Sequence, residues 1–465
     1  AHTALPIGFI TRTRLAHKTP SGYATPSRIV LMSNENAPPA VTPSEDAVVP
    51  SPAADKPVEL DANRKGIQAY LAPGASDWAP LNEEAHIVLK GAPPSDTARI
   101  VSNRTALSDM LAAALQVPNL GFLAGSGTSL GAPGGPSMWD LWKRSMCTAG
   151  SGDPTEAAAR VMDVVHYKET TNPNIEHFLS QCDAYLAFNK DATVEEFVSE
   201  VKAVILHACS AFLRAPTADI SAYRQLLQKL ARRRVRDPRL KVFTTNYDMC
   251  FETAASDLGM MAIDGFSYTR RRRFDGKHFS YDIVRREAEG HEFAEGVFQL
   301  LKLHGSVSWS REEKDIYEDT APTPANACLI YPAKGKYQQA FLQPHLELLS
   351  RYLEFLRQPN SCLIVAGFGF NDDHLSEPIF SAIQSNPSLK LILCDFQCIT
   401  HLHNRGHHGS SDYWGRFHDL ARRGLDIHFI SGSFSDLVSH IPHLRTASPA
   451  EQLANAVRRL GSQNA

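Results

Sequence analysis

Short apolar runs alternate with longer amphipathic stretches along most of the chain. Each run is bounded by turn-forming or polar residues, which is the pattern of a strand buried on both faces. Strands that alternate with helices predict a parallel sheet with right-handed crossovers. The sequence therefore predicts an α/β fold with a Rossmann-like parallel sheet of about six strands flanked by helices. The expected strands cover 120–124, 240–244, 298–303, 361–366, 389–394 and 425–430.

Helical periodicity fills the stretches between these runs. Apolar residues from Val194 to Phe212 recur every three or four positions, as on one face of a helix. The helices between about 150 and 236 follow one another with no strand among them, so they form a helical insertion after the first strand. The charged segment 262–297 is expected to form a loop or a small hairpin. The other expected helices cover 106–115, 154–167, 174–188, 220–234, 338–356, 375–384, 412–423, 433–440 and 447–462.

The first 60 residues have a different composition. The segment 37–56 is rich in Pro, Ala, Ser and Asp and holds few large apolar side chains, so burial cannot offset the entropy lost on ordering. We therefore predict a disordered segment over 1–60 and one folded domain over 61–465, which includes the helical insertion. The first methionine is Met32, which leaves open whether residues 1–31 belong to the native protein.

Composition and charge narrow the class of protein. A net charge of -3 and a pI near 6.7 disfavour direct nucleic-acid binding. The arginine cluster Arg232–Arg236 fits a helix end, and Arg270–Arg273 fits a solvated loop, although the second leaves room for an acidic partner. The eight cysteines include no C-x-x-C pair, and no apolar run approaches the roughly 20 residues that cross a bilayer. These features predict a cytoplasmic protein with reduced thiols, no metal and no membrane contact.

The first expected strand runs into the segment Gly125–Ser129, which reads GSGTS. Two glycines let a backbone turn tightly after a strand and approach a pyrophosphate, while amides and the hydroxyls of Thr128 and Ser129 supply donors. Such glycines also serve strand-to-helix packing, so the motif by itself favours neither function. The dinucleotide fingerprint of dehydrogenases is incomplete, because Leu130 stands where its third glycine belongs.

Three polar residues follow the next two strands. Asn246 and Asp248 come after the strand at 240–244, and His304 follows the strand at 298–303. The carboxyl ends of parallel strands meet at one edge of the sheet, where ligands collect, so these side chains should share a crevice with the glycine turn. Asn246 can fix a carboxamide, a ribose hydroxyl or a water, and His304 suits a general base. Structural alternatives are an Asx-turn for Asp248 and a hydrogen-bonded core position for His304.

Two later strand ends complete the expected crevice. The strand at 361–366 runs into Gly367 and Gly369, which would form a second wall. Asp395 ends the strand at 389–394 and could accept hydrogen bonds from an adenosine ribose, although a helix cap or a loop turn is the commoner role of such a residue. A glycine turn, an Asn/Asp pair and a histidine at one edge suggest a dinucleotide held for cleavage rather than for hydride transfer.

Taken in order, these motifs resemble the sirtuin-like (silent information regulator) NAD-binding fold. The resemblance runs from about 118 to 435 and rests on G-x-G-x-S, T-x-N-x-D, H-G and the later glycine-containing strand end. It implies a catalytic domain in which Asn246 and His304 are the catalytic residues and Asp248 lies beside the nicotinamide pocket. The expected NAD-binding residues are Gly125, Ser126, Gly127, Thr128, Ser129, Asp248, Gly367, Gly369 and Asp395.

Two departures separate the chain from the sirtuin deacylases. Those enzymes hold a structural zinc with two C-x-x-C pairs, and this chain has no such pair. Their glycine loop continues into a Pro-Asp-Phe-Arg segment, whereas residues 131–137 here read GAPGGPS. The pattern is closer to the bacterial sirtuin-like NAD hydrolases of antiphage defence, which it resembles in 303–309, in 369–374 and in the helical insertion.

That resemblance implies an NAD glycohydrolase, with NAD as substrate and no metal. In the implied mechanism His304 acts as a base or as the hydrogen-bond partner of a ribose hydroxyl, and Asn246 orients the ribose or the attacking water. The glycine loop holds the pyrophosphate, so that remote binding energy serves the reacting carbon. Two other functions stay open: a non-catalytic module that senses NAD or ADP-ribose, and a zinc-free NAD-dependent protein deacylase.

The resemblance also implies a defence effector that depletes NAD when a partner activates it. The partner would be a HerA-like hexameric ATPase or an Argonaute-like protein. Because an unregulated NAD hydrolase would harm its own cell, we expect low basal activity. The helical insertion offers surface for self-association, so a homo-oligomer is also expected.

Overall fold

The structure is a computed structural model that describes most of the chain. The described residues are 66–94, 97–169, 173–233, 237–287, 290–331, 342–403 and 412–443. They belong to one compact unit, which spans Glu59–Ala465. The expectations for 1–60, for the first residues of the helix at 338–356 and for the helix at 447–462 lie outside the described residues.

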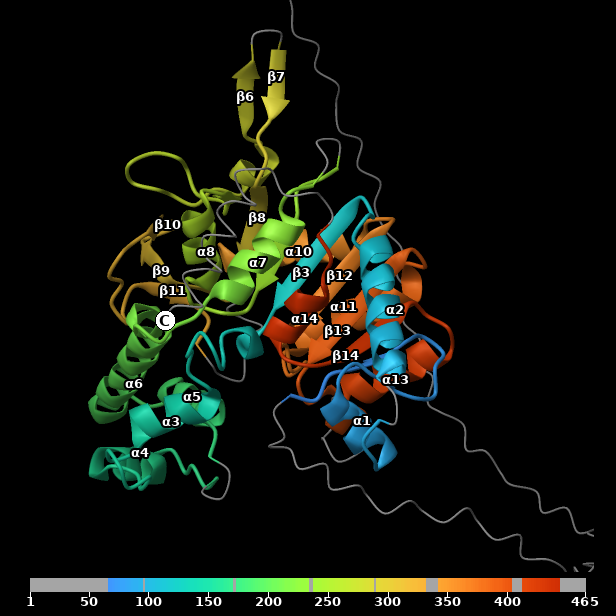
Figure 1. The fold of residues 1–465 in the computed structure, drawn as a ribbon. Coiled ribbons are helices and arrows are strands. Elements are labelled where there is room, and N and C mark those ends of the chain that lie inside the picture. The colour runs from blue at the N-terminus through green and yellow to red at the C-terminus, as the bar shows by residue number, and fades with distance from the viewer. Residues whose placement is uncertain are drawn as a thin grey trace, which may run out of the picture. The chain divides into compact units, whose positions relative to one another are not determined.

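A nine-stranded sheet forms the centre of this unit (Figure 1). Its strands are β1 (Ala69–Leu71), β2 (Ala79–Pro80), β3 (Asn119–Ala124), β4 (Lys241–Thr244), β5 (Met261–Ile263), β8 (Val297–Lys302), β12 (Ser361–Ala366), β13 (Leu389–Asp395) and β14 (Ile427–Ser431). Their order is β2-β1-β14-β13-β12-β3-β4-β8-β5. All neighbours from β14 to β5 are parallel, whereas β1 and β2 extend the β14 edge in antiparallel orientation.

The apolar runs predict six of these strands correctly, but the expected count of about six strands is wrong, because the sheet has nine. The additional strands β1, β2 and β5 contain two or three residues each. A segment this short produces neither an apolar run nor a clear alternation. These strands therefore become visible only through their pairing with neighbours.

Helices cover both faces of the sheet. One face carries α2 (Ala98–Ala114), α7 (Ser221–Leu230), α8 (Cys250–Leu258) and α14 (Phe434–His440), and the other carries α10 (His345–Arg357), α11 (Asp373–Ser385), α12 (Cys398–His403) and α13 (Tyr413–Arg422). Side chains alternate between the two faces along each strand. Phe122 of β3 therefore packs in the apolar cluster on the α2 face, and Leu123 packs in the cluster on the α10 face. Because both faces are buried, the central strands are largely apolar, with a few polar exceptions such as the buried Lys302 of β8.

Apolar periodicity predicts the longer helices correctly, although α2 begins well before its expected start. The sequence gives no prediction for α1 (Glu83–Lys90), α3 (Met138–Met146), α8 or α12. These four helices contain six to nine residues, which is too few turns for a distinct pattern. Among the described residues, no helix combines the length and the apolar character that a bilayer crossing requires.

The helical segment after β3 has an apolar cluster of its own. It consists of α3, α4 (Glu156–Val164), α5 (Ile175–Leu186) and α6 (Ala192–Ala211). Phe178 packs edge-on against Trp142 and Tyr167 within this cluster. Val307 of the strand Gly305–Glu312 belongs to it, and Tyr247 of the loop after β4 packs against it, so these helices contact segments that follow the carboxyl ends of β4 and β8. Helix α7, which lies within the expected insertion, packs on the sheet instead.

Two small antiparallel sheets complete the described structure. β9 (Gly305–Glu312) pairs with β10 (Asp315–Glu318) and with β11 (Ala327–Leu329). β6 (Val284–Glu287) and β7 (Gly290–Phe293) form a hairpin, which is one of the two alternatives expected for 262–297. The same segment contains the short 3-10 helix η3 (Gly276–Ser280).

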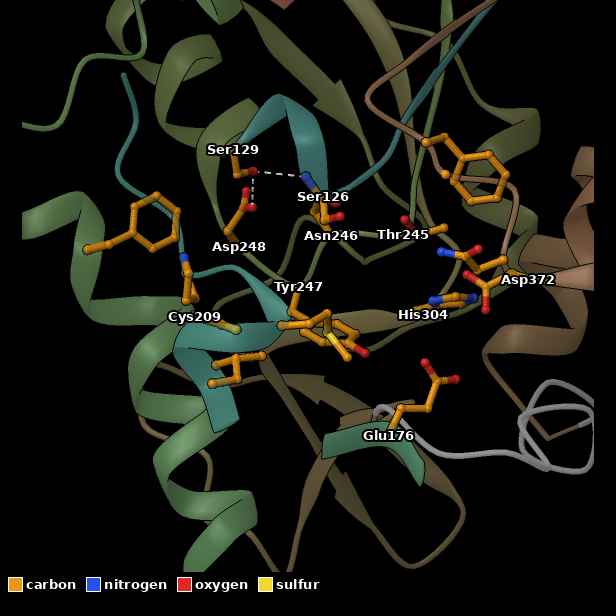
Figure 2. A pocket seen from close by; sticks show the side chains of 17 residues that line it. Ser126, Ser129, Glu176, Cys209, Thr245, Asn246, Tyr247, Asp248, His304 and Asp372 are labelled. Atoms are coloured by element: carbon orange, nitrogen blue, oxygen red, sulfur yellow. Dashed lines mark hydrogen bonds between the residues drawn. The ribbon is translucent and has the colours of Figure 1, made fainter. Parts of the chain in front are cut away.

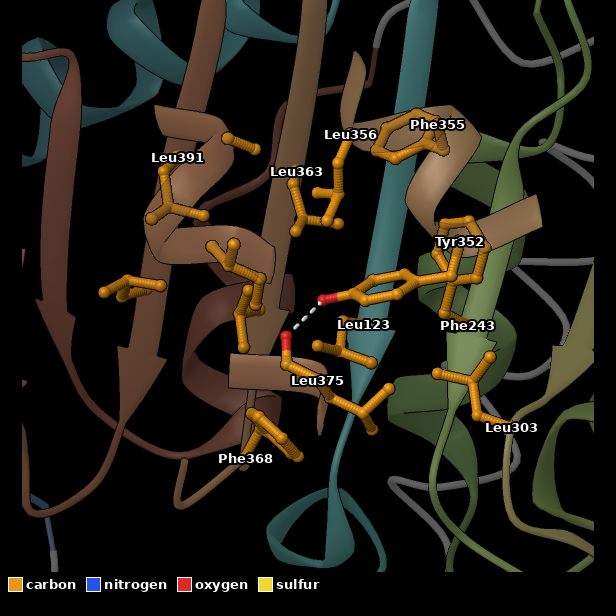
Figure 3. Packing of buried hydrophobic residues seen from close by; sticks show 14 of the residues in the cluster. Leu123, Phe243, Leu303, Tyr352, Phe355, Leu356, Leu363, Phe368, Leu375 and Leu391 are labelled. Atoms are coloured by element: carbon orange, nitrogen blue, oxygen red, sulfur yellow. Dashed lines mark hydrogen bonds between the residues drawn. The ribbon is translucent and has the colours of Figure 1, made fainter. Parts of the chain in front are cut away.

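The aromatic cluster under α10 offers a test of the core packing. The rings of Phe355 and Tyr352 lie 5.4 and 5.2 Å from that of Phe243 in β4 (Figure 3). Phe355→Ala removes a fully buried ring, so we expect the free energy of unfolding to fall by about 3–5 kcal/mol in urea titrations. The control is Phe188→Ala, whose ring is 91% exposed, and it should change stability by less than about 0.5 kcal/mol. Equal stabilities for the two variants would contradict this packing.

Candidate active site

Four strand ends lie level at one edge of the sheet. The registers align Ala124 of β3 with Thr244 of β4 and Ala366 of β12, and Thr244 with Lys302 of β8. The chain leaves β3 toward β4 on one side and later returns to β12 on the other side, so the strand order reverses between β3 and β12. Ligands of open parallel sheets bind outside the carboxyl ends of the strands at such a reversal. The predicted motifs lie at this position.

The loops after β3 and β12 touch through their backbones. The amide of Gly127 donates to the carbonyl of Gly367 at 2.9 Å, and that of Gly125 donates to the carbonyl of Ala366 at 3.0 Å. A Cβ on Gly125 would lie 2.4 Å from the Gly367 oxygen, and one on Gly127 would lie 2.7 Å from the Gly367 Cα. Gly367 also has a φ of 59°, which side-chain-bearing residues rarely adopt. Backbone packing therefore requires all three glycines.

Most amides of the glycine loop are engaged within the protein. Besides those of Gly125 and Gly127, the amide of Thr128 donates to the Gly125 carbonyl at 3.0 Å, and that of Ser129 donates to the Ser126 carbonyl at 3.1 Å. These bonds close the short 3-10 helix η1 (Ser126–Thr128). Ser126 and Ser129 line the neighbouring cavity. The phosphate-binding role of the loop stays a prediction, and it relies more on hydroxyls than on a row of free amides.

The hydroxyls of that loop orient Asn246, and Figure 2 shows its hydrogen bond with Ser129. Its Nδ2 donates to Ser129 Oγ at 2.8 Å and to Thr128 Oγ1 at 3.1 Å, so Oδ1 is the atom that it can offer to a bound hydroxyl or water. Ser129 Oγ donates to Asp248 Oδ2 at 2.5 Å, and the Tyr223 hydroxyl donates to Thr128 Oγ1 at 2.9 Å. All five side chains are buried, so the network holds Asn246 in one orientation.

Asp248 forms the Asx-turn that is one of its two expected roles. Its Oδ1 accepts from the amide of Cys250 at 3.0 Å, and its Oδ2 accepts from Ser129. Beneath this turn, the buried Lys302 donates to the carbonyl of Asp248 and forms an ion pair with Glu252 at 2.8 Å. Asp248 also lines the cavity. Its contacts within the protein are those of a residue that positions the loop.

His304 lies in the turn between β8 and β9 and is 3% exposed. Its carbonyl accepts from the amide of Ile330 at 2.8 Å, and its Nε2 lies 3.2 Å from Nε2 of His374. Gly305, with a φ of 84°, has no room for a side chain, because a Cβ would lie 2.2 Å from the Cys328 carbonyl. This turn places the His304 ring in the cavity wall. His304 is thus a buried residue with a partner inside the protein, and its ring also lines the cavity.

These residues surround a cavity of about 170 Å³. Sites that enclose a whole small molecule have volumes of roughly 300–1,000 Å³, so part of a dinucleotide fits here. The lining includes the carboxylates of Glu176, Asp248 and Asp372, and no lysine or arginine among the described residues. The cavity therefore favours a positively charged group.

Many residues of the site were not among the candidates from the sequence, and four of these carry a carboxylate, thiol or imidazole. Glu176 and Cys209 reach the cavity from the helical segment, and no local pattern marks them. Asp372 lines the cavity and His374 contacts His304; both belong to the polar run after Gly369, which is the signal that could have identified them. Burial, with a smaller contribution from a nearby carboxylate, raises the pKa of Cys209 to about 12. Its thiol stays protonated and is not a nucleophile.

Of the last two predicted NAD-binding residues, Gly369 and Asp395, one lines the cavity and the other does not. Gly369 lines the cavity. Asp395 ends β13 and is not part of the cavity lining. Its Oδ1 accepts from the amide of Gln397 at 2.8 Å and lies 3.6 Å from Nε2 of His401. These contacts match the loop-turn alternative, and a bond to an adenosine ribose stays a prediction.

The fold and the site are those of a Rossmann-like α/β protein with a polar cavity where the strand order reverses. A family model, the SIR2-like domain, matches residues 240–393, about a third of the chain. No curated protein matches the chain. The matched segment contains Asn246 and His304, so it supports a SIR2-like domain and an NAD-related activity. The glycine loop at 125–129 lies outside the matched residues, and the backbone contacts described above bring it against them.

His345 provides a pH-dependent test of the support behind His304. Its Nδ1 lies 3.1 Å from the carbonyl of Leu303, and burial lowers the pKa of His345 from 6.5 to about 4. The folded protein therefore favours the neutral ring, and protonation of the unfolded chain below pH 6.5 shifts the equilibrium toward unfolding. We expect the free energy of unfolding to decrease as the pH is lowered from 6.5 to 4. In His345→Gln this decrease should be smaller by about 3 kcal/mol. Urea titrations across this range measure both slopes, and equal slopes would contradict the assignment.

Proposed function

We propose that the protein is an NAD glycohydrolase, which cleaves the bond between nicotinamide and ribose. The products are nicotinamide and ADP-ribose. The observation that carries the proposal is the position of Asn246 and His304 on one acidic cavity at the reversal of the strand order. The match of 240–393 to the SIR2-like domain supports NAD as the ligand.

The charge of the cavity suits the nicotinamide end of NAD. The nicotinamide ring carries the positive charge of the molecule, and the diphosphate carries its negative charges. The carboxylates of Glu176 and Asp372 favour the cationic ring inside the cavity. They also favour the positive charge that develops on the ribose as the bond breaks. The diphosphate would then lie beside the glycine loop, whose Ser126 and Ser129 line the cavity.

The reaction consumes one water and needs no general acid. Nicotinamide leaves as a neutral molecule with the electron pair of the broken bond, and an oxocarbenium-like ribose remains. Water adds its oxygen to the ribose carbon and gives up one proton. Asn246 Oδ1 would accept a hydrogen bond from this water or from a ribose hydroxyl, because Ser129 and Thr128 hold its Nδ2. His304 would accept the proton.

The contribution of His304 is measured by NAD turnover in purified full-length protein. We expect release of nicotinamide and ADP-ribose without any peptide, and a rate at least about 100-fold lower in His304→Ala. The matched control is His291→Ala, because His291 is exposed on β7 and away from the cavity lining. Unchanged turnover in folded His304→Ala would exclude His304 from the mechanism.

A non-catalytic sensor of NAD or ADP-ribose is the second candidate. The protein contacts that hold Asp248 and His304 favour it, because both groups have structural partners. Absence of turnover, together with binding of either ligand in isothermal titration calorimetry, would support the sensor. A zinc-free deacylase is the third candidate, and turnover that requires an acylated peptide would identify it.

We also propose a cytoplasmic role in antiphage defence, in which an activating partner triggers depletion of NAD. The resemblance of 303–309 and 369–374 to defence hydrolases supports this role, and a HerA-like hexameric ATPase or an Argonaute-like protein would be the partner. Addition of the partner is expected to raise a low basal turnover.

The oligomeric state is a separate part of this proposal. The helical segment α3–α6 exposes apolar side chains such as Trp139 and Val164, which offer a surface for a second copy of the chain. Size-exclusion chromatography with light scattering is expected to give a mass above 51.2 kDa. A mass equal to that of one chain would contradict the homo-oligomer.

A further inference from the structure

The proposed hydrolysis uses only one member of a cluster formed by His304, Asp372 and His374. The ligand atoms of all three residues lie within 4.8 Å of one another. His374, in the first turn of α11, is 9% exposed, and Asp372 directly precedes that helix and lines the cavity. His304 lies across from them on the turn after β8. Residues from two separate strand ends therefore bring three metal-ligating groups together.

The distance between the two histidines fits two ligands on one metal ion. Zinc binds histidine nitrogen at about 2.0–2.1 Å, so two such bonds at a tetrahedral angle place the nitrogens about 3.3–3.4 Å apart. The two Nε2 atoms lie 3.2 Å apart. Asp372 is partly exposed, and its ligand oxygen lies within 4.8 Å of the ligand nitrogens of both histidines. The three groups are therefore close enough to act as ligands of one ion.

The ligand types and the surrounding charge select the kind of ion. Two imidazoles and one carboxylate suit zinc and neighbouring divalent transition metals, and three protein ligands leave a coordination position open. Glu176 and Asp248 line the same cavity, and no described lysine or arginine does. A divalent cation is therefore favoured at this place by charge as well as by ligand chemistry.

A hydrogen bond between the two imidazoles is the competing explanation of the short distance. One Nε2 would carry the hydrogen and the other would accept it, and no ion is then required. The two explanations differ in what they predict for added metal. A hydrogen-bonded pair gives no specific binding, whereas a ligand cluster binds one ion in a manner that depends on each of its members.

We propose that His304, Asp372 and His374 bind a divalent transition-metal ion of the zinc class, and that the bound ion blocks NAD hydrolysis. Binding follows from the cluster itself. Inhibition rests on the proposed function, because the ion occupies the His304 nitrogen that the hydrolysis requires. Release of the ion restores that nitrogen to its role as proton acceptor.

Metal binding is tested first on chelator-treated full-length protein. Cobalt(II) reports the site through its visible absorption, and zinc binding is measured by isothermal titration calorimetry. We expect one ion per chain, with affinity reduced at least about tenfold in His374→Ala and in Asp372→Asn and unchanged in His291→Ala. Thermal unfolding checks that each variant is folded, and Asp372→Asn changes only a partly exposed group. Absence of binding, equal affinity in all variants, or an absorption typical of thiolate ligands would overturn the site.

Inhibition is tested in the NAD turnover assay. Zinc is expected to lower turnover at least about tenfold, a chelator should restore it, and Asp372→Asn should need more zinc for the same effect. Undiminished turnover with zinc bound would overturn the inhibition and leave the hydrolase standing. Binding without any turnover would overturn the proposed function, and with it the inhibition, while the metal site would stand on the calorimetry.

Discussion

The close backbone contact between the loops after β3 and β12 is the constraint on which the site depends. Gly127 and Gly367 approach so closely that a methyl group on either would overlap the backbone of the other. This contact fixes where the first loop turns, and the turn presents its hydroxyls to Asn246. A glycine motif that resembles a phosphate cradle therefore also acts as the scaffold of the catalytic candidate.

The polar groups of the site have two different roles. Asn246, Ser129 and Asp248 are buried and bonded to one another, which offsets the cost of removing them from water. Glu176 and Asp372 line the cavity, where their charge acts on whatever enters it. The first group fixes geometry, and the second selects the charge of the ligand. A cationic nicotinamide ring and a divalent metal ion are both positively charged, so the same carboxylates favour both. The two proposals therefore concern the same cavity.

The helical segment α3–α6 encloses the site, which the sheet alone would leave open to water. The strand ends provide Asn246 and His304, but a crevice at the edge of a sheet is open to water. The helical segment adds Met138, Leu141 and Glu176 to the cavity lining. The segment thus lowers the local exposure to solvent, and electrostatic interactions are stronger in such a place. Chemistry and enclosure come from parts of the chain that are separate in sequence.

Hydrophobic patterning along the chain is enough to predict the central strands and the edge of the sheet at which the site lies. Strands buried on both faces are largely apolar, so six of them are visible as runs. The parallel arrangement then places Asn246 and His304 at one edge. The folded structure is needed to see that Asp248 holds a loop, that Glu176 lines the cavity and that His374 contacts His304. The reason is that periodicity records only whether a position is buried and where a strand ends. Contacts between distant segments depend on how the strands pair and how the helices pack, and no local pattern contains that information.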